Sequence, residues 1–399
     1  MSALHDVVII GAGVAGCSIA LHLAKLGIRS QIIERESIAA RASGKSWAVF
    51  AYPPRFLALE DQPPDLLFSM PPGSVHPWLE LMWLGYHRLP GMAMELREAT
   101  GVDIGYGELA WIRLAYTEQQ EEVYRAALAL QQRQGYHEGH WMEAKELRAL
   151  FPTINPLSRG GMALPYLQVE PYRYTLALGQ AAEKRGATIR QGEVVAFGKA
   201  GGKVRCAVLA TGAEVEADAF ILATGPWTSR ASAALGREIR VLVNREQCIR
   251  MHPPAPLPPC GLVAPDGVTI IPKAGGDVIV GHAGQADLQQ DFDVSLTTEE
   301  VRMHLLSGAT ELLPGLGEAH LVEHRGDFEG WSPPPHRIRP MLGRLPECEN
   351  AYVAARFGTL GMMMSPGTGQ IMADLVAAGG AASLRFRRLL EVLAPGGEH

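Results

Sequence analysis

The chain has 399 residues, of which 47% are apolar and 20% charged, a balance that supports a large buried core and about two domains. Its formal net charge of -6 lacks the basic excess with which nucleic-acid-binding surfaces neutralise phosphates. We therefore expect no nucleic-acid partner.

Five cysteines are scattered without paired spacing, and this pattern suits neither a disulfide framework nor a zinc site: Cys17, Cys206, Cys248, Cys260 and Cys348. We expect a reducing compartment, a cytoplasmic location and no bound metal. The chain runs directly into an apolar strand without a basic leader, so its start is interpreted as a domain start and not as a signal peptide. Because no run of about 18 apolar residues is free of charge and proline, no transmembrane helix is expected. Peripheral membrane contact stays open.

The first predicted elements are a strand, a glycine turn and a helix. Residues 6–10 are apolar and β-branched, residues 11–16 read Gly-Ala-Gly-Val-Ala-Gly, and residues 17–26 have a helical pattern. Gly11 allows a tight turn, Gly13 lets the backbone approach a pyrophosphate, and Gly16 lets helix and strand pack closely. The N–H groups at the start of the helix would then bind the phosphates.

A second predicted strand, residues 30–33, ends at Glu34. An acid about 20 residues after the glycine turn binds the ribose hydroxyls of a dinucleotide. Glu34 favours FAD or NAD over a cofactor with a 2′-phosphate, although Arg35 directly follows it. The first 35 residues therefore predict a Rossmann-type βαβ unit.

Later segments predict further strands around the same nucleotide. Residues 203–209 and 214–217 predict a hairpin that leads into a buried strand ending in Ala223-Thr224-Gly225. Residues 351–355 predict another strand, and a loop separates it from a helix over residues 367–378. Ser365 as N-cap and Pro366 at the first helical position predict the start of this helix. Residues 240–251, 268–272 and 278–281 predict further strands.

The motifs taken together resemble the D-amino acid oxidase superfamily of FAD-dependent oxidoreductases, in its glycine oxidase and sarcosine oxidase branch. Beyond the glycine turn, the segments that carry the resemblance are Arg41-Ala42-Ser43-Gly44-Lys45-Ser46, Val169-Glu170-Pro171-Tyr172, Ala223-Thr224-Gly225-Pro226-Trp227, Gly343-Arg344 and Phe357-Gly358-Thr359-Leu360-Gly361. The resemblance covers essentially the whole chain. It implies an α/β Rossmann-like FAD-binding domain (residues 1–50, 150–235 and 325–399) interleaved with an α+β substrate domain on a mixed or antiparallel sheet (residues 51–149 and 236–324).

The resemblance also implies which residues contact FAD. Glu34 and Arg35 would meet the adenosine ribose, Val195 the adenine, Ala42 and Ser43 the pyrophosphate side, residues 47–49 the flavin, and residues 357–363 the isoalloxazine ring. The complete predicted set is Gly11, Gly13, Val14, Ala15, Gly16, Glu34, Arg35, Ala42, Ser43, Lys45, Ser46, Trp47, Ala48, Val49, Val195, Ala223, Thr224, Gly225, Trp227, Gly343, Arg344, Phe357, Gly358, Thr359, Leu360, Gly361, Met362 and Met363.

Several positions depart from the family pattern. Ser332 and Thr359 replace the arginines that grip a substrate carboxylate, and Thr269 replaces a tyrosine of that pocket. Hydroxyl groups cannot offer the charged bidentate fork of arginine, so glycine oxidase activity is not expected. Gly330 replaces the cysteine that tethers FAD in sarcosine oxidases, which implies noncovalent FAD. Ile279 replaces their oxygen-activating lysine, which leaves O2 and a quinone or carrier protein as alternative electron acceptors.

The catalytic residues stay open at this point. Candidates that could face the substrate are Lys45, Ser332, Thr359, Arg337, Arg339 and His282. The expected reaction is oxidation of the C–N bond of a small amine or amino-acid-like substrate, with hydride transfer to flavin N5. Two alternatives remain: a flavin dehydrogenase that oxidises a C–O bond, and an FAD-binding protein with a degraded pocket.

Overall fold

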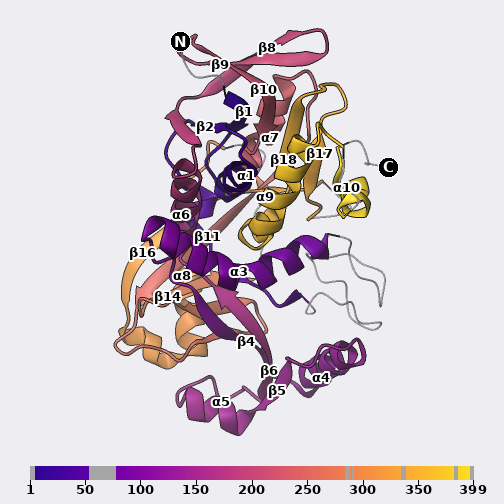
Figure 1. Ribbon diagram of the computed structural model, residues 1–399. Helices are drawn as coiled ribbons and strands as arrows, with labels where there is room; N and C mark the ends of the chain where they lie inside the picture. The colour runs from indigo at the N-terminus through magenta and orange to yellow at the C-terminus, as the bar shows by residue number, and fades with distance from the viewer. Residues whose placement is uncertain are drawn as a thin grey trace.

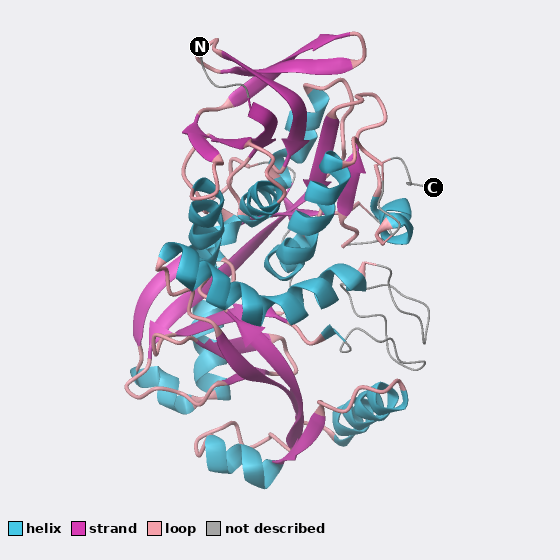
Figure 2. Cartoon of the chain, viewed as in Figure 1, coloured by secondary structure: helices cyan, strands magenta, loops and turns pink. Residues whose placement is uncertain are grey.

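The computed structural model describes residues 5–53, 78–283, 288–289, 292–333, 338–381 and 385–395. They form two sheets, with helices packed on and between them (Figures 1 and 2). None of the helices in these ranges combines the length and apolar character that crossing a bilayer requires. The same ranges contain no group of three or more His, Cys, Asp or Glu side chains that could hold a metal ion.

The first sheet has a parallel centre in the order β18-β10-β1-β2-β7, with β17 antiparallel at one edge. An antiparallel hairpin of β8 and β9 extends from β10. Its strands are β1 (His5–Ile10), β2 (Ser30–Glu34), β7 (Thr188–Gln191), β8 (Val194–Ala200), β9 (Lys203–Leu209), β10 (Glu214–Leu222), β17 (Met341–Arg344) and β18 (Ala351–Ala355). The apolar residues of β1 and β18 are buried, as expected for parallel strands covered by helices.

The second sheet follows the order β15-β11-β14-β13-β12-β4-β6-β3, with β16 paired to β11 and β5 to β6. All its pairs are antiparallel except β4 with β12, so the sheet is mixed. Its strands are β3 (Val49–Phe50), β4 (Gly107–Ala115), β5 (His140–Glu143), β6 (Gly160–Gln168), β11 (Leu242–His252), β12 (Cys260–Val263), β13 (Val268–Pro272), β14 (Val278–His282), β15 (Leu288–Gln289) and β16 (His320–Trp331). The predicted fold class is confirmed.

Helices join the two sheets into one body. The helices α1 (Val14–Lys25), α6 (Pro171–Glu183) and α9 (Gly361–Ala377) pack beside the first sheet, and α3 (Leu79–Thr100) crosses between the sheets against α6 and α9 (Figure 1). One hydrophobic core includes Ile9 of the first sheet, Met82 of α3 and Leu164 of the second sheet. The other helices are α2 (Ala42–Lys45), α4 (Glu118–Arg133), α5 (Ala144–Leu150), α7 (Thr228–Ala233), α8 (Glu299–Leu312) and α10 (Arg387–Leu393).

The strands β6 and β16 belong to the second sheet. Residues 160–168, and residues 325–331 of β16, fall within the ranges predicted for the FAD-binding domain. The division into two domains at those boundaries therefore stays a prediction.

Helix α9 begins earlier than the sequence predicts. It starts at Gly361, directly after the short 3-10 helix η4 (Gly358–Leu360), and Pro366 lies inside it. Pro366 has no N–H to donate to the carbonyl of Met362, and the hydroxyl of Ser365 donates to that carbonyl at 2.8 Å instead. The predicted N-cap at Ser365 is wrong: Ser365 lies inside α9, and its hydroxyl supplies the hydrogen bond that Pro366 cannot donate.

Candidate cofactor-binding site

A cavity of about 420 Å³ lies at the carboxyl ends of β1, β2, β10 and β18. In open α/β sheets ligands bind at this edge. Its wall includes the following predicted residues: Gly11, Gly13, Val14, Ala15, Glu34, Arg35, Ala42, Ser43, Ser46, Val195, Ala223, Thr224, Gly225, Trp227, Phe357, Gly358, Thr359, Gly361 and Met362. The structure therefore brings together segments from four distant parts of the chain.

The glycine turn has no room for side chains. Gly11 has a φ of +108°, and a Cβ there would lie 2.5 Å from the carbonyl oxygen of Ala223. A Cβ on Gly16 would lie 2.0 Å from the carbonyl oxygen of Gly11. The turn after β1 is thus pressed against both the loop after β10 and its own helix, as the sequence pattern requires.

Two side chains hold this turn in place. The Glu34 carboxylate accepts from the N–H of Ala12 at 2.8 Å, and the Ser43 hydroxyl accepts from the N–H of Val14 at 3.0 Å. Ser43 thereby sits at the N-terminus of α1, where the helix dipole and unpaired N–H groups favour negative charge.

Arginines surround Trp227 at this part of the wall. The Arg35 guanidinium lies 4.2 Å and that of Arg41 5.5 Å from the centre of the Trp227 ring, and both form ion pairs with Glu36. The Trp227 ring also stacks on that of Phe292, with 5.0 Å between the ring centres. The cavity therefore offers fixed cations and an aromatic surface, which suit a phosphate-bearing aromatic ligand.

The other end of the cavity is formed by the loop after β18, the start of α9 and the end of β16. Gly361 and Met362 bring the N-terminus of α9 to the cavity, and Phe328, Glu329 and Gly330 line it from β16. Arg356 also lines this end, with a left-handed φ of +61° and only 3% exposure. Its Nε and Nη2 donate to the carbonyl of Arg240 at 2.9 and 2.6 Å.

Two carboxyl groups lie side by side on β11 and β16. Asn244 is the register partner of Glu329, and Glu246 that of Asp327, so Glu246 and Glu329 share one sheet face. The Glu329 carboxylate accepts from Trp331 Nε1 at 3.0 Å and Asn244 Nδ2 at 3.3 Å. Burial raises the pKa of Glu329 to about 7, and burial together with the charge of Glu329 raises the pKa of Glu246 well above its ordinary value.

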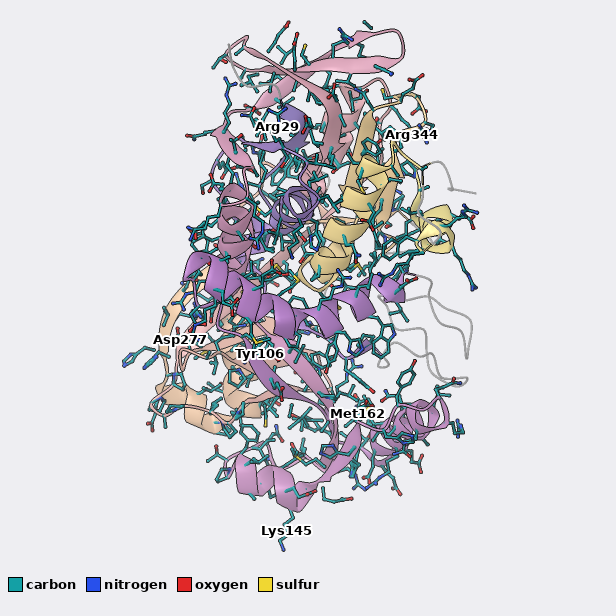
Figure 3. All side chains as sticks on the ribbon, viewed as in Figure 1. Arg29, Tyr106, Lys145, Met162, Asp277 and Arg344 are labelled. Carbon is teal, nitrogen blue, oxygen red and sulfur yellow. The ribbon has the colours of Figure 1, made fainter. Side chains whose placement is uncertain are left out.

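Nine predicted cofactor residues do not line this cavity: Gly16, Lys45, Trp47, Ala48, Val49, Leu360, Met363, Gly343 and Arg344. Gly16 packs against the carbonyl of Gly11 in the glycine turn, and Leu360 and Met363 are buried in the core. Arg344 pairs with Tyr352 at the amino end of β18, whereas the cavity lies at the carboxyl ends (Figure 3). Because β17 runs antiparallel to β18, its last residues, Gly343 and Arg344, lie away from the cavity.

The candidate catalytic residues are dispersed. Thr359 lines the cavity. Lys45 forms an ion pair with the buried carboxylate of Asp327 at 2.7 Å. The Ser332 hydroxyl accepts from the N–H of Arg339 at 2.7 Å and donates to its carbonyl at 2.9 Å, so Ser332 closes a loop. The Arg339 guanidinium reaches the carbonyl of Val392 at 3.5 Å.

The two remaining candidates are His282 and Arg337. His282 lies 5.4 Å, ring centre to ring centre, from His304 of α8, on the side of β14 that faces away from Trp47. Burial lowers its pKa. Arg337 lies outside the described residues. The hydroxyl of Thr269, the residue that replaces the tyrosine of the family's pocket, donates to the carbonyl of Gly267 at 3.0 Å.

The sequence interpretation missed part of the wall, including Gly192, Glu193, Arg41, Arg230, Glu329 and Arg356. One signal was present: Arg325, Asp327 and Glu329 alternate along a strand. Charges at every second position mark one polar face of a strand, and here that face points inward.

Comparison with known proteins identifies the family. A family model described as FAD dependent oxidoreductase (DAO) matches residues 6–375. The chain belongs to this family. It is 29% identical over 380 residues to a glycine oxidase from Geobacillus kaustophilus, covering 94% of each chain. The structure of a glycine oxidase from Bacillus cereus ATCC 14579 superposes with a TM-score of 0.83 at 25% identity, covering 98% of both chains.

A third relative shows the fold alone. The iminodiacetate oxidase from Chelativorans sp. BNC1 has a TM-score of 0.80 at 23% identity and covers 98% of both chains. FAD is the cofactor of the family, and the cavity fits it. The glycine turn leaves the backbone accessible, and the buried hydroxyl of Ser46, at the cavity wall, has no partner among the described residues.

We predict that FAD is held without a covalent bond. None of the five cysteines, all of which are described and buried, lines the cavity. A side chain at Gly330 would start 3.3 Å from the backbone of Pro226. Acid precipitation of the purified protein should leave a colourless pellet and a yellow supernatant. A yellow pellet would contradict this prediction.

Proposed function

We propose that the cavity binds FAD, with the ADP half between the glycine turn, Glu34 and Val195, and with the flavin ring at the end formed by residues 356–362 and β16. The wall supports this orientation because the glycine turn and the N-terminus of α1 suit a pyrophosphate. The start of α9 would face the ring and favour negative charge there.

We further propose that the protein oxidises the C–N bond of a small amine or amino-acid-like substrate. Bound FAD supplies a two-electron acceptor that takes a hydride at N5. The residues of the chain bind and orient the substrate over this acceptor, and water completes hydrolysis of the imine product. The observation that carries this proposal is the similarity to glycine oxidases along almost the whole chain, together with the cavity at the expected sheet edge.

The polar groups near the ring end favour an amine over a carboxylate as the recognised group. Ser332 is bonded to the backbone of Arg339, and Thr359 offers a neutral hydroxyl. Glu329 lines this end with Glu246 beside it. Carboxylates bind ammonium groups, whereas a substrate carboxylate needs a guanidinium fork. The Arg356 guanidinium at this end directs Nε and Nη2 to the carbonyl of Arg240 instead. We therefore propose that glycine is a poor substrate.

Anaerobic titration of the bound flavin tests this function. Simple amines and N-methyl amines should bleach the flavin absorbance, with glycine at least about tenfold less effective in rate because the Arg356 guanidinium at this end already donates through two nitrogens to the carbonyl of Arg240. An equal response to glycine would contradict the specificity.

Bleaching by hydroxy acids alone would establish C–O oxidation instead, and rapid bleaching by NADPH alone would contradict both amine and hydroxy-acid oxidation. If nothing bleaches the flavin, the pocket has lost its activity. Repeating the reoxidation with O2 and with a quinone distinguishes the electron acceptors.

A further inference from the structure

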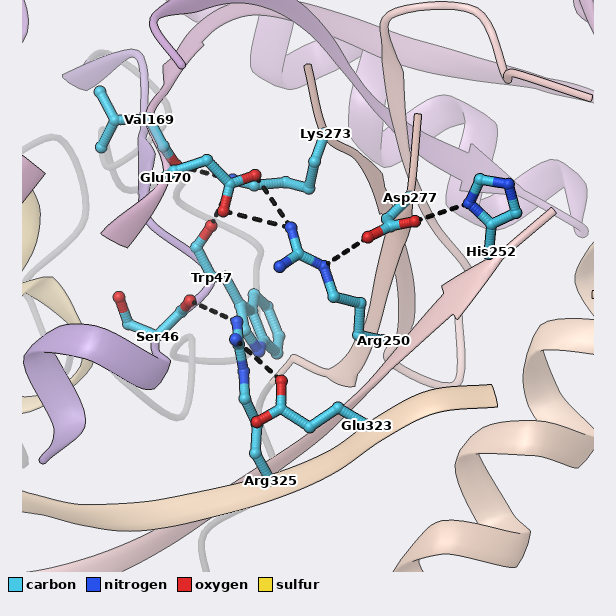
Figure 4. A network of polar contacts seen from close by, with 10 residues as sticks. All are labelled: Ser46, Trp47, Val169, Glu170, Arg250, His252, Lys273, Asp277, Glu323 and Arg325. Carbon is cyan, nitrogen blue, oxygen red and sulfur yellow. Dashed lines mark hydrogen bonds and ion pairs between the residues drawn. The ribbon is translucent and has the colours of Figure 1, made fainter. Parts of the chain in front are cut away.

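Two buried cations hold the backbone that follows α2. Lys273, which is 5% exposed, donates through Nζ to the carbonyl of Trp47 at 3.0 Å and to that of Val169 at 2.8 Å. Arg325, which is 9% exposed, donates through Nη2 to the carbonyl of Ser46 at 3.3 Å (Figure 4). The N–H of Val169 donates to the carbonyl of Ala48 at 3.0 Å. Three successive carbonyls are thus fixed from the side of the second sheet.

The same contacts determine where the N–H groups point. In a trans peptide the N–H lies opposite the carbonyl of the preceding residue. The N–H groups of Trp47 and Ala48 therefore point away from Arg325 and Lys273, respectively. Neither N–H donates to an acceptor in the described part of the chain. Ala48 is 3% exposed and has a left-handed φ of +53°. A strained, buried segment with unpaired donors indicates a bound acceptor.

Among the residues that the structure describes, no carboxylate forms an ion pair with Lys273. Glu170 at the N-terminus of α6, whose charge acts on Lys273, directs both oxygens to Arg250 of β11, at 3.0 and 3.2 Å. Arg250 also pairs with Asp277, which binds His252 (Figure 4). Arg325 of β16 binds Glu323. The ammonium group of Lys273 is therefore shared between two backbone carbonyls.

We propose that Lys273 and Arg325 are positioning residues for the flavin: they orient residues 46–48 so that the N–H groups of Trp47 and Ala48 donate to acceptor atoms of the ring. Trp47 and Ala48 are not part of the cavity wall, but they directly follow Ser46, which is, and this inference rests on the proposed binding of FAD in that adjacent cavity. The positive charge of Lys273 would also act on the ring through this segment and make it a better acceptor of electrons.

Burial lowers the pKa of Lys273 to about 8. Glu170 opposes this effect, Arg250 and Arg325 add to it, and Cys248 of β11 opposes it weakly. Lys273 is therefore charged below about pH 8 and neutral above it. An arginine in its place would remain charged over this range.

The test measures sulfite binding, because sulfite adds to oxidised flavin more tightly when positive charge lies near the ring. Purified holoprotein carrying Lys273→Met should retain FAD but bind sulfite about tenfold more weakly, the scale of one unit of charge acting through protein. Lys273→Arg should restore most of the affinity. The matched control, Lys145→Met, removes an exposed lysine of α5 and should behave as wild type (Figure 3). Wild-type affinity in Lys273→Met would overturn the proposal.

A second measurement keeps the proposal testable if Lys273→Met does not fold. Sulfite affinity of wild type and of Lys273→Arg is compared from pH 7 to pH 9, so that the ionisation of sulfite affects both equally. The wild type should lose affinity relative to Lys273→Arg as pH rises through about 8. Parallel curves would overturn the role of Lys273. The readout needs no substrate, so it separates this inference from amine oxidation, whereas a wild-type protein that binds no FAD would refute both.

Discussion

Replacing Gly11 by alanine is expected to abolish FAD binding at working concentrations, with at least about a hundredfold loss of affinity. The new Cβ would lie 2.5 Å from the carbonyl oxygen of Ala223, and the φ of +108° is unfavourable for alanine. Relief of this clash must separate the turn after β1 from the loop after β10, which together form the cavity wall. The measurement is the FAD content per chain after gel filtration, followed by fluorescence titration of the apoprotein.

Gly27→Ala is the matched control for this substitution. Gly27 also has a positive φ, of +75°, but no heavy atom lies within 4 Å of the position of its Cβ. The control should lose about 1 kcal/mol of stability from backbone strain and keep its FAD. Normal FAD content in Gly11→Ala would show that the cofactor binds elsewhere.

Stability is expected to fall between pH 5 and pH 8 because of the carboxyl pair on β11 and β16. The pKa of Glu329 is raised to about 7 by burial, above that of an unfolded glutamate. Between these two values the folded state retains a proton that the unfolded state releases, so the free energy of unfolding decreases as pH rises. The full contribution is about 3–4 kcal/mol, from a rise of about 2.5 pKa units at about 1.4 kcal/mol per unit.

Glu329→Gln should remove much of this pH dependence. Its carboxamide oxygen can still accept from Trp331 and Asn244, while the neutral group relieves the repulsion with Glu246. Chemical denaturation of the holoprotein at pH 5 and pH 8 measures the difference. Glu122→Gln, at an exposed position of α4, is the control and should keep the wild-type slope. Equal slopes in wild type and Glu329→Gln would contradict the raised pKa.

The sequence pattern was sufficient to predict those parts of the site whose residues lie close together in the chain. The strand, glycine turn and helix at residues 6–26 follow from residue size and periodicity, and Glu34 follows from its spacing to the turn. Other residues occupy the cavity through strand pairing that local pattern does not specify. Glu329 reaches the wall because β16 pairs with β11, and Lys273 meets Trp47 across two elements distant in sequence.

Two expectations depended on contacts that the local sequence does not contain: the N-cap at Ser365, which is wrong, and the role of Ser332 at the substrate, which stays a prediction. Ser365 and Pro366 have the same local chemistry at a helix start and in a helix interior, and only the preceding turn at residues 358–360 distinguishes them. Ser332 could be aligned with a substrate-binding arginine, yet its two hydrogen bonds to Arg339 depend on how the loop closes. The roles of Ser365 and Ser332 depend on where their side chains point, and tertiary contacts determine that direction.

The order of strands along the chain has a consequence for how the protein is made. The first strand, β1, and one of the last, β18, both pair with β10, and the strands β3–β6 and β11–β16 of the other sheet are synthesised between them. The first sheet therefore cannot close until residues up to the end of β18 have left the ribosome. Such non-local pairing predicts slow folding, exposure of unpaired apolar strands during synthesis and dependence on chaperones. Removal of either end of the chain also takes away a strand of the first sheet, β1 or β18, so truncated forms should aggregate and not fold as smaller units.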